Sequence, residues 1–203
     1  MKVETSIQGF TLIELMIVLA LAALLLVMAA PGISVYLENT KIRNVAESIA
    51  AGMRQARLHA MAKSAPTEVV INRADGSWTI WQLDDTETPV KRVDPFVESF
   101  VWGAGGHNWK GVSVIVNPAA AVSADEIMVT FDQNTGRALR SNLATTATLS
   151  PPSPPNNITV TGSLAGTRRL QVDVRMTGGV RVCDPDPSFP STDPKSCRFS
   201  PLP

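Results

Sequence analysis

The 203-residue sequence has no net charge and contains little histidine and little cysteine. Its 18 basic and 18 acidic residues balance to a formal charge of zero, so bulk electrostatics point to no particular partner. Its two histidines, His59 and His107, lie far in sequence from its two cysteines, Cys183 and Cys197. A zinc site needs four ligands that come together, and this spacing does not predict one.

Motifs for catalysis are missing as well. The sequence contains no nucleophile elbow, no phosphate-binding loop and no cluster of metal ligands. The glycine-rich segment Gly103–Gly106 lies between predicted strands and opens no helix, so it fails the test for a dinucleotide site. His107 stands beside Trp109 with nothing near to complete a triad, and Asp84-Asp85 is read as a solvated loop rather than a cation site. We therefore expect no enzyme and no cofactor.

A long apolar run is the main feature that is present. Phe10 to Ala30 is long enough to cross a bilayer as a helix and carries one charge, Glu14. A carboxylate near the centre of a membrane helix costs roughly 3 kcal/mol, so such residues usually mark a function. The alternative is an ordinary anchor that tolerates a glutamate near its end. A polar leader, Met1 to Gly9, precedes the run, whereas a secretory signal has its small-residue cleavage site after the run.

The segment Gly9-Phe10-Thr11-Leu12-Ile13-Glu14-Leu15 resembles the processing signature of type IV pilins and type II secretion pseudopilins. The resemblance implies that a prepilin peptidase cuts after Gly9 and N-methylates Phe10. Residues 1–9 would then be a cytoplasmic leader, and the helix would stay in the protein. It would serve first as an inner-membrane anchor and later as the core of a filament assembled by an inner-membrane platform.

The resemblance also suggests a role in assembly for Glu14. Cleavage creates an α-amino group on Phe10, whose unperturbed pKa is about 7.7–8.0. In a bundle of parallel helices, Glu14 of one subunit could meet the Phe10 amine of its neighbour. A buried ion pair of this kind fixes register more than it adds stability.

The helical pattern continues beyond the apolar run to about residue 63. Pro31 removes an amide donor, so we expect a kink there rather than a plain helix end. From residue 33 to residue 63 the pattern is amphipathic, with a basic face expected to be solvated, and Ser64-Ala65-Pro66 ends the helix. The apolar face predicted to contact the head comprises Ile42, Val45, Ala46, Ile49, Met53, Ala56 and Ala60.

The remainder, residues 64–203, has the two-residue period and the turn signals of antiparallel strands. An Asp75-Gly76 turn predicts a hairpin, residues 84–89 a polar loop, and the proline-rich residues 141–157 an exposed loop. The four tryptophans, Trp78, Trp81, Trp102 and Trp109, are expected to help build the core. Strands are predicted over residues 67–72, 77–83, 97–102, 111–116, 126–132, 137–140, 158–161, 169–175 and 179–183.

The predicted fold class is therefore α+β. A long, kinked N-terminal transmembrane helix precedes a periplasmic head of about eight to ten antiparallel strands in two sheets. The Phe131-Asp132…Gly136-Arg137 pattern resembles the head of GspH/FimT-type minor pilins. Beyond a membrane the environment is oxidising, so we expect Cys183 and Cys197 to form a disulfide, with two free thiols as the alternative.

Arg181 is the candidate for contact with DNA. Some GspH/FimT members bind DNA through a Gly-Arg-x-Arg segment, but here the matching stretch is Gly178-Gly179-Val180-Arg181, which lacks the first arginine. The charges around it are nearly balanced, so we expect weak or no binding, with Arg181 a strand residue that points to solvent.

Three functions compete at this stage. The first is a minor pilin that starts or caps a type IV pilus, favoured by the resemblance of Val180-Arg181-Val182-Cys183 and a second cysteine to the endings of type IV pilus members. The second is a pseudopilin that drives protein export by type II secretion. The third is a DNA-binding subunit for uptake. An anchored enzyme stands last.

Overall fold

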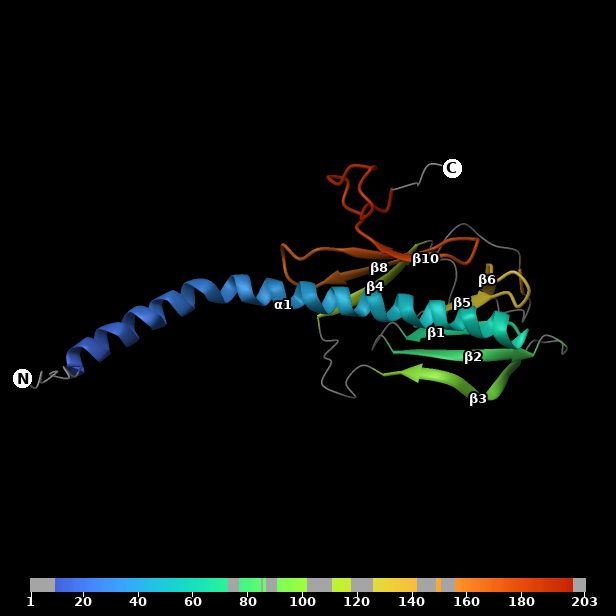
Figure 1. Cartoon of the computed structure of the whole chain (residues 1–203), viewed down its shortest axis with the longest axis horizontal. Coiled ribbons are helices and arrows are strands. Elements are labelled where there is room, and N and C mark those ends of the chain that lie inside the picture. The colour runs from blue at the N-terminus through green and yellow to red at the C-terminus, as the bar shows by residue number, and fades with distance from the viewer. Residues whose placement is uncertain are drawn as a thin grey trace, which may run out of the picture.

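The computed structural model describes residues 10–72, 77–84, 86, 91–101, 111–117, 126–141, 149–150 and 156–198. The first element is a 52-residue helix, α1 (Leu12–Lys63). Thr11 caps its first turn, and Ser64 ends it in a left-handed conformation whose N–H bonds to the Ala60 carbonyl. The predicted stop at residues 64–66 is therefore confirmed. The first half of α1 extends away from the head, and the second half is packed within it (Figure 1).

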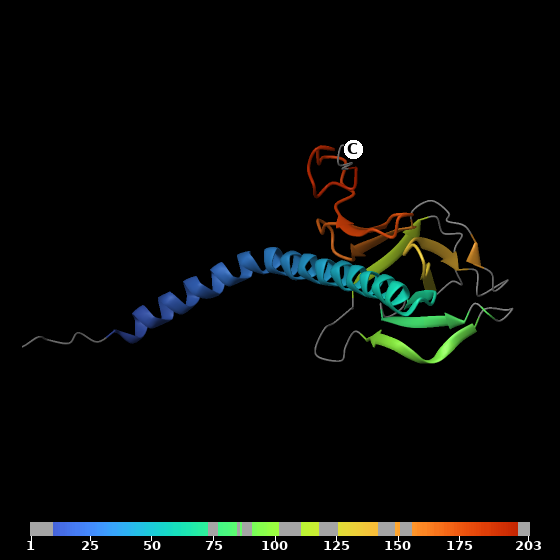
Figure 2. The same ribbon diagram turned by 45° about the vertical axis from the view of Figure 1, so that its right-hand side comes forward.

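Two antiparallel sheets follow the helix. The larger has the order β3-β2-β1-β5-β6-β7 and the smaller the order β10-β9-β8-β4. Figure 2 shows the C-terminal half of α1 lying between them. The predicted two-sheet head is confirmed. The strands are β1 (Thr67–Asn72), β2 (Trp78–Asp84), β3 (Lys91–Phe100), β4 (Val112–Asn117), β5 (Glu126–Phe131), β6 (Ala138–Ser141), β7 (Leu149–Ser150), β8 (Asn156–Gly162), β9 (Leu170–Val174) and β10 (Val180–Cys183).

The hydrophobic core lies between α1 and the inner faces of both sheets. The helix contributes the seven apolar residues predicted from its periodicity, and each is buried. Val69 and Ile71 of β1 meet them from one sheet, and Ile158 and Val172 meet them from the other. Since burying a large aliphatic side chain contributes roughly 1.5–3 kcal/mol, the second half of α1 is an integral part of the head.

The structure departs from the predicted strands in two places. β3 begins at Lys91, six residues before the predicted strand at residue 97, and β7 lies within the predicted loop of residues 141–157. β3 is an edge strand whose neighbour in the sheet is β2. An edge strand tolerates charged residues and a proline, here Pro95, and these interrupt the apolar–polar alternation from which a strand is predicted. The Asp75-Gly76 turn lies outside the described residues.

The two described tryptophans differ in how deeply they are buried. Trp78 lies in the core, stacks on Phe100 at 5.7 Å between ring centroids, and donates to Ser48 Oγ. Trp81 is half-buried on the other face of its sheet, where its ring meets Phe96 edge-on. Trp102 and Trp109 lie outside the described residues.

The long helix is bent. Its parts Leu12–Val27 and Gly32–Lys63 meet at 46°, and the interval between them contains Pro31. That Pro31 causes the bend is still a prediction. By length and composition, no single straight helix of the described chain could cross a membrane, but this bent pair could.

Candidate assembly helix and its attachment to the head

The N-terminal end of the described chain is open to solvent. Phe10 precedes the helix and is 88% exposed. Thr11 has extended backbone angles, φ −79° and ψ 152°, and its hydroxyl accepts a hydrogen bond from the Glu14 N–H at 3.3 Å. Helix N-termini carry unpaired N–H groups, which a threonine cap satisfies in part. Phe10, the predicted methylation position, is therefore placed outside the helix, while Gly9 lies outside the described residues.

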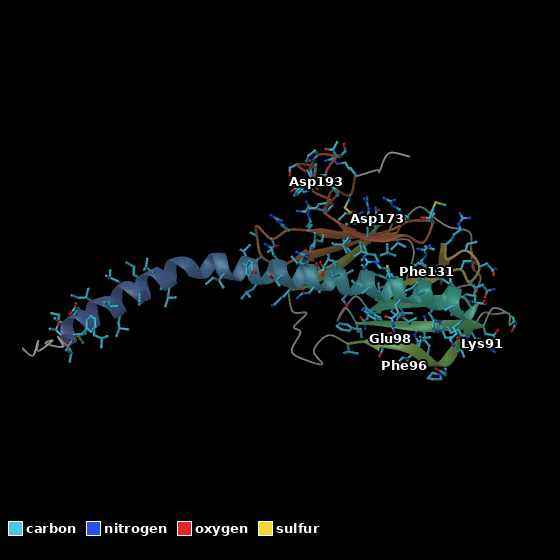
Figure 3. The ribbon with its side chains drawn as sticks, viewed as in Figure 1. Lys91, Phe96, Glu98, Phe131, Asp173 and Asp193 are labelled. Carbon is cyan, nitrogen blue, oxygen red and sulfur yellow. A yellow bond between two sulfur atoms is a disulfide. The ribbon has the colours of Figure 1, made fainter. Side chains whose placement is uncertain are left out.

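An apolar surface surrounds Glu14. Twelve large apolar side chains between Leu12 and Val27 are each at least 55% exposed, and the Glu14 side chain is exposed among them. Figure 3 shows side chains standing out on all sides of this part of the helix. Exposed apolar surfaces of this extent mark contact with lipid or with another protein. Within the described chain, the head covers none of these twelve residues.

Glu38 marks the point at which the helix enters the head. Its side chain is buried, and its Oε1 accepts hydrogen bonds from the Ser163 N–H, from the Ser163 hydroxyl at 3.2 Å and from the Leu164 N–H at 3.1 Å. The neighbouring Asn39 Oδ1 accepts from the Arg168 N–H at 2.8 Å. These bonds join α1 to the turn between β8 and β9, more than 120 residues away in sequence.

The environment of Glu38 favours its charged form. Burial alone would raise the pKa of this carboxyl, but the hydrogen bonds from Leu164 and Ser163 outweigh burial and leave the pKa below its ordinary value. Sequence reasoning did not single out Glu38. A signal was available, because Glu38 falls on the same helix face as Ile42, Val45 and Ile49, and an acid on a buried face requires a partner.

At the other end of the head, α1 holds two turns together. Arg57 Nε donates to the Gly136 carbonyl at 3.1 Å, and Gly178 lies directly against that same carbonyl. Arg54 Nε donates to the Val180 carbonyl at 3.4 Å. The helix face predicted to be solvated therefore donates two hydrogen bonds to the head, and Arg57 is half-buried. Arg57 thus links the helix to the larger sheet, and Arg54 links it to the smaller sheet.

The Cys183–Cys197 disulfide is present, which confirms the prediction. It closes the disulfide loop, residues 184–196, which stands off the smaller sheet at the top of Figure 1. Arg181 does not point freely to solvent as expected. Its Nε donates to Asp173 Oδ2 at 3.1 Å, and its NH2 donates to the Cys197 carbonyl at 2.7 Å. Its planar guanidinium fastens the base of the loop to the sheet.

The remaining polar candidates have structural roles. His59 Nδ1 lies 3.3 Å from Thr67 Oγ1, and its pKa is lowered by burial and by the nearby Lys63. Asp84 Oδ1 accepts from the Thr86 N–H and hydroxyl in a local turn. Among the described residues, no group of three or more histidines, cysteines and acids is arranged to hold a metal ion.

Comparison with known proteins agrees with these observations. The prokaryotic N-terminal methylation motif matches residues 5–30. The type IV minor pilin FimU of Pseudomonas aeruginosa has a similar crystal structure, with a TM-score of 0.50 at 15% sequence identity, covering 80% of this chain and 98% of FimU. The chain therefore carries the N-terminal methylation motif of prokaryotic prepilins and has a fold like that of a type IV minor pilin.

Two further solved structures resemble this pilin-like chain. The minor pseudopilin EpsH from the type II secretion system of Vibrio cholerae has a TM-score of 0.47 at 10% identity, covering 71% of this chain and 98% of EpsH. A second crystal form of FimU has a TM-score of 0.46 at 15% identity, covering 76% of this chain and 98% of that one. A search of curated proteins finds no match to the sequence.

Proposed function

We propose that this protein is a minor pilin of the GspH/FimT type, which joins a type IV pilus through its N-terminal helix and acts in filament initiation or at the tip. The observation that carries the proposal is the exposed apolar half of α1 with Glu14 in its first turn. The head leaves this surface uncovered, and a bundle of parallel helices would cover it.

In this proposal the leader lies in the cytoplasm, Phe10 to Ala30 spans the inner membrane, and the head lies in the periplasm. After cleavage at Gly9, Glu14 pairs with the methylated amine of Phe10 on a neighbouring subunit. A tip subunit has neighbours on one side only, so it would form the Glu14–Phe10 ion pair on that side alone.

The type IV pilus is preferred to type II secretion because the smaller sheet ends in Val180-Arg181-Val182-Cys183, closed by Cys197, as type IV pilus members end. Deletion of the gene tests the choice. We expect fewer surface pili and unchanged export of folded proteins. Normal piliation with exoproteins retained in the periplasm would instead assign the protein to a type II secretion system.

A further inference from the structure

The end of the head nearest the exposed half of α1 is formed by the turn Ser163–Arg169, which joins β8 to β9. The hydrogen bonds of Glu38 and Asn39 hold this turn alongside the helix. In Figures 1 and 2 the orange turn lies at the end of the head that faces the N-terminus. Its position relative to the apolar helix is therefore fixed by these hydrogen bonds.

Basic residues gather at this end. Arg168 and Arg169 are exposed on the turn, and Lys41 is half-buried on the adjoining turn of the helix. The nearest carboxylate, Glu38, is buried and already accepts hydrogen bonds from the turn, while Asp186 of the disulfide loop acts on Arg169 from the other side. Three cations thus face two carboxylates, of which one, Asp186, is exposed, and the net charge is positive.

Exposed apolar and aromatic side chains occur at the same level along the helix axis, with Leu164 on the turn and Tyr36 on the opposite side of the helix. Tyr36 is 70% exposed and Leu37 54% exposed on the helix just before Glu38, and Leu164 is 43% exposed at the turn. Tyrosine is enriched where a protein crosses from hydrocarbon to water, since its ring is apolar and its hydroxyl is polar. Exposed arginines beside an exposed leucine, at the level where a tyrosine also stands on the helix, are typical of the part of a protein that meets lipid headgroups.

The length of the helix sets the height of this surface above the membrane. Eight residues separate Ala30 from Glu38, which is about 12 Å of helix. The headgroup layer extends roughly 5–8 Å beyond the hydrocarbon. The remaining gap is within the Debye length of about 8 Å at physiological salt, so the cations would feel the charge of anionic lipids.

We propose that, in the membrane-anchored subunit, the surface formed by Lys41, Leu164, Arg168 and Arg169 docks on anionic phospholipid headgroups. This proposal rests on the proposed membrane anchoring of residues 10–30. Docking would hold the head against the leaflet from which its helix emerges until the subunit is drawn into a filament.

The test places the full chain, one copy per lipid nanodisc, in zwitterionic lipid or in lipid with roughly 30% phosphatidylglycerol. A bimane fluorophore on Ala165→Cys, an exposed position of the turn, reports quenching by a nitroxide on the lipid headgroup. Each arginine near an anionic surface shifts the ratio of docked to undocked heads by about fivefold. Arg168→Gln/Arg169→Gln should therefore lower that ratio roughly thirtyfold in anionic discs.

The matched control is Lys63→Gln/Arg137→Gln, which removes the same charge from exposed positions at the opposite end of the head. It should leave quenching unchanged, and about 0.5 M salt should abolish the anionic dependence. Equal quenching in both lipids, or no effect of the arginine pair, would overturn the docking surface alone. Quenching that needs several subunits per disc rather than anionic lipid would assign the surface to a neighbouring subunit. A chain that does not float with lipid would overturn the anchoring and the docking together.

Discussion

The carboxylate of Glu38 accepts three hydrogen bonds from Ser163 and Leu164, and it is the first buried side chain along α1 among the described residues. Among residues 10–27 and 32–37, all but the half-buried Val35 are exposed, whereas one face of the helix beyond Glu38 lies in the core. The contact therefore divides one continuous helix into a part available for the membrane or filament and a part committed to the head.

Removing this contact should loosen the head. Glu38→Ala removes the acceptor shared by the N–H groups of Ser163 and Leu164 and the Ser163 hydroxyl, and hydrogen bonds to a charged group contribute about 1.5–3 kcal/mol. Thermal unfolding of the full chain in detergent micelles would measure the loss. Glu47→Ala is the control, because the ion pair that Glu47 makes with Arg43 is exposed to solvent and its loss should change stability little. Equal effects of the two substitutions would contradict the role given to Glu38.

The same carboxylate predicts a pH dependence. Because the folded pKa of Glu38 lies below the unfolded value of about 4.3, its contribution is complete above that value and is lost as pH falls through the folded pKa. Wild-type chain should lose more stability than Glu38→Gln when the pH is lowered from about 5 to about 3. Parallel losses would show that the carboxylate is not stabilised by folding.

Two glycines with nearly equal backbone angles allow a test of the junction between the sheets. Gly178 has φ +81° and Gly166 has φ +83°. Alanine in this region costs about 1–2 kcal/mol of backbone strain at either position. At Gly178 the added methyl also collides with the Gly136 carbonyl, whereas Gly166 has open space around it. Gly178→Ala should therefore destabilise the head clearly more than Gly166→Ala, and equal melting temperatures would contradict the packed junction.

The pairing role of Glu14 is tested by filament incorporation. Glu14→Gln keeps the size of the side chain and removes the charge, so the Phe10 amine of the neighbour would be left without its partner. We expect the variant to float with membranes as wild type does but to fall roughly tenfold or more in sheared filaments. Unchanged incorporation would show that assembly does not depend on the pair.

Arg181 should matter for the disulfide loop rather than for DNA, because its guanidinium is engaged by Asp173 and the Cys197 carbonyl. The full chain in detergent should bind duplex DNA more weakly than about 1 µM at physiological salt in a gel-shift titration. Arg181→Ala should lower the melting temperature without changing that result. Micromolar or tighter binding that weakens steeply with salt and is lost in this variant would favour the uptake hypothesis.

Much of the fold could be predicted because its signals are local in sequence. The helix face from Ile42 to Ala60, the stop at Ser64, the turn from Asp132 to Arg137 and the cysteine pair all follow from periodicity, capping, turn chemistry or compartment. The first part of edge strand β3, residues 91–96, gave no such signal, since an edge strand needs only one partner and tolerates charges.

The contacts that attach the helix to the head could not be predicted in the same way. Glu38 and Ser163 are 125 residues apart, and Arg57 and Gly136 are 79 apart. Their pairing depends on how the two sheets fold around the helix. A basic helix face was therefore expected to be solvated, although Arg54 and Arg57 donate to carbonyls of the head.

The central claim is that this helix is a processed pilin helix. Mass spectrometry of the protein isolated from native membranes or filaments tests it most directly. We predict a mature chain that begins with N-methylated Phe10, and we predict that Gly9→Val blocks cleavage but not membrane insertion. A mature chain that begins at Met1, or one cut after Ala30, would contradict the account.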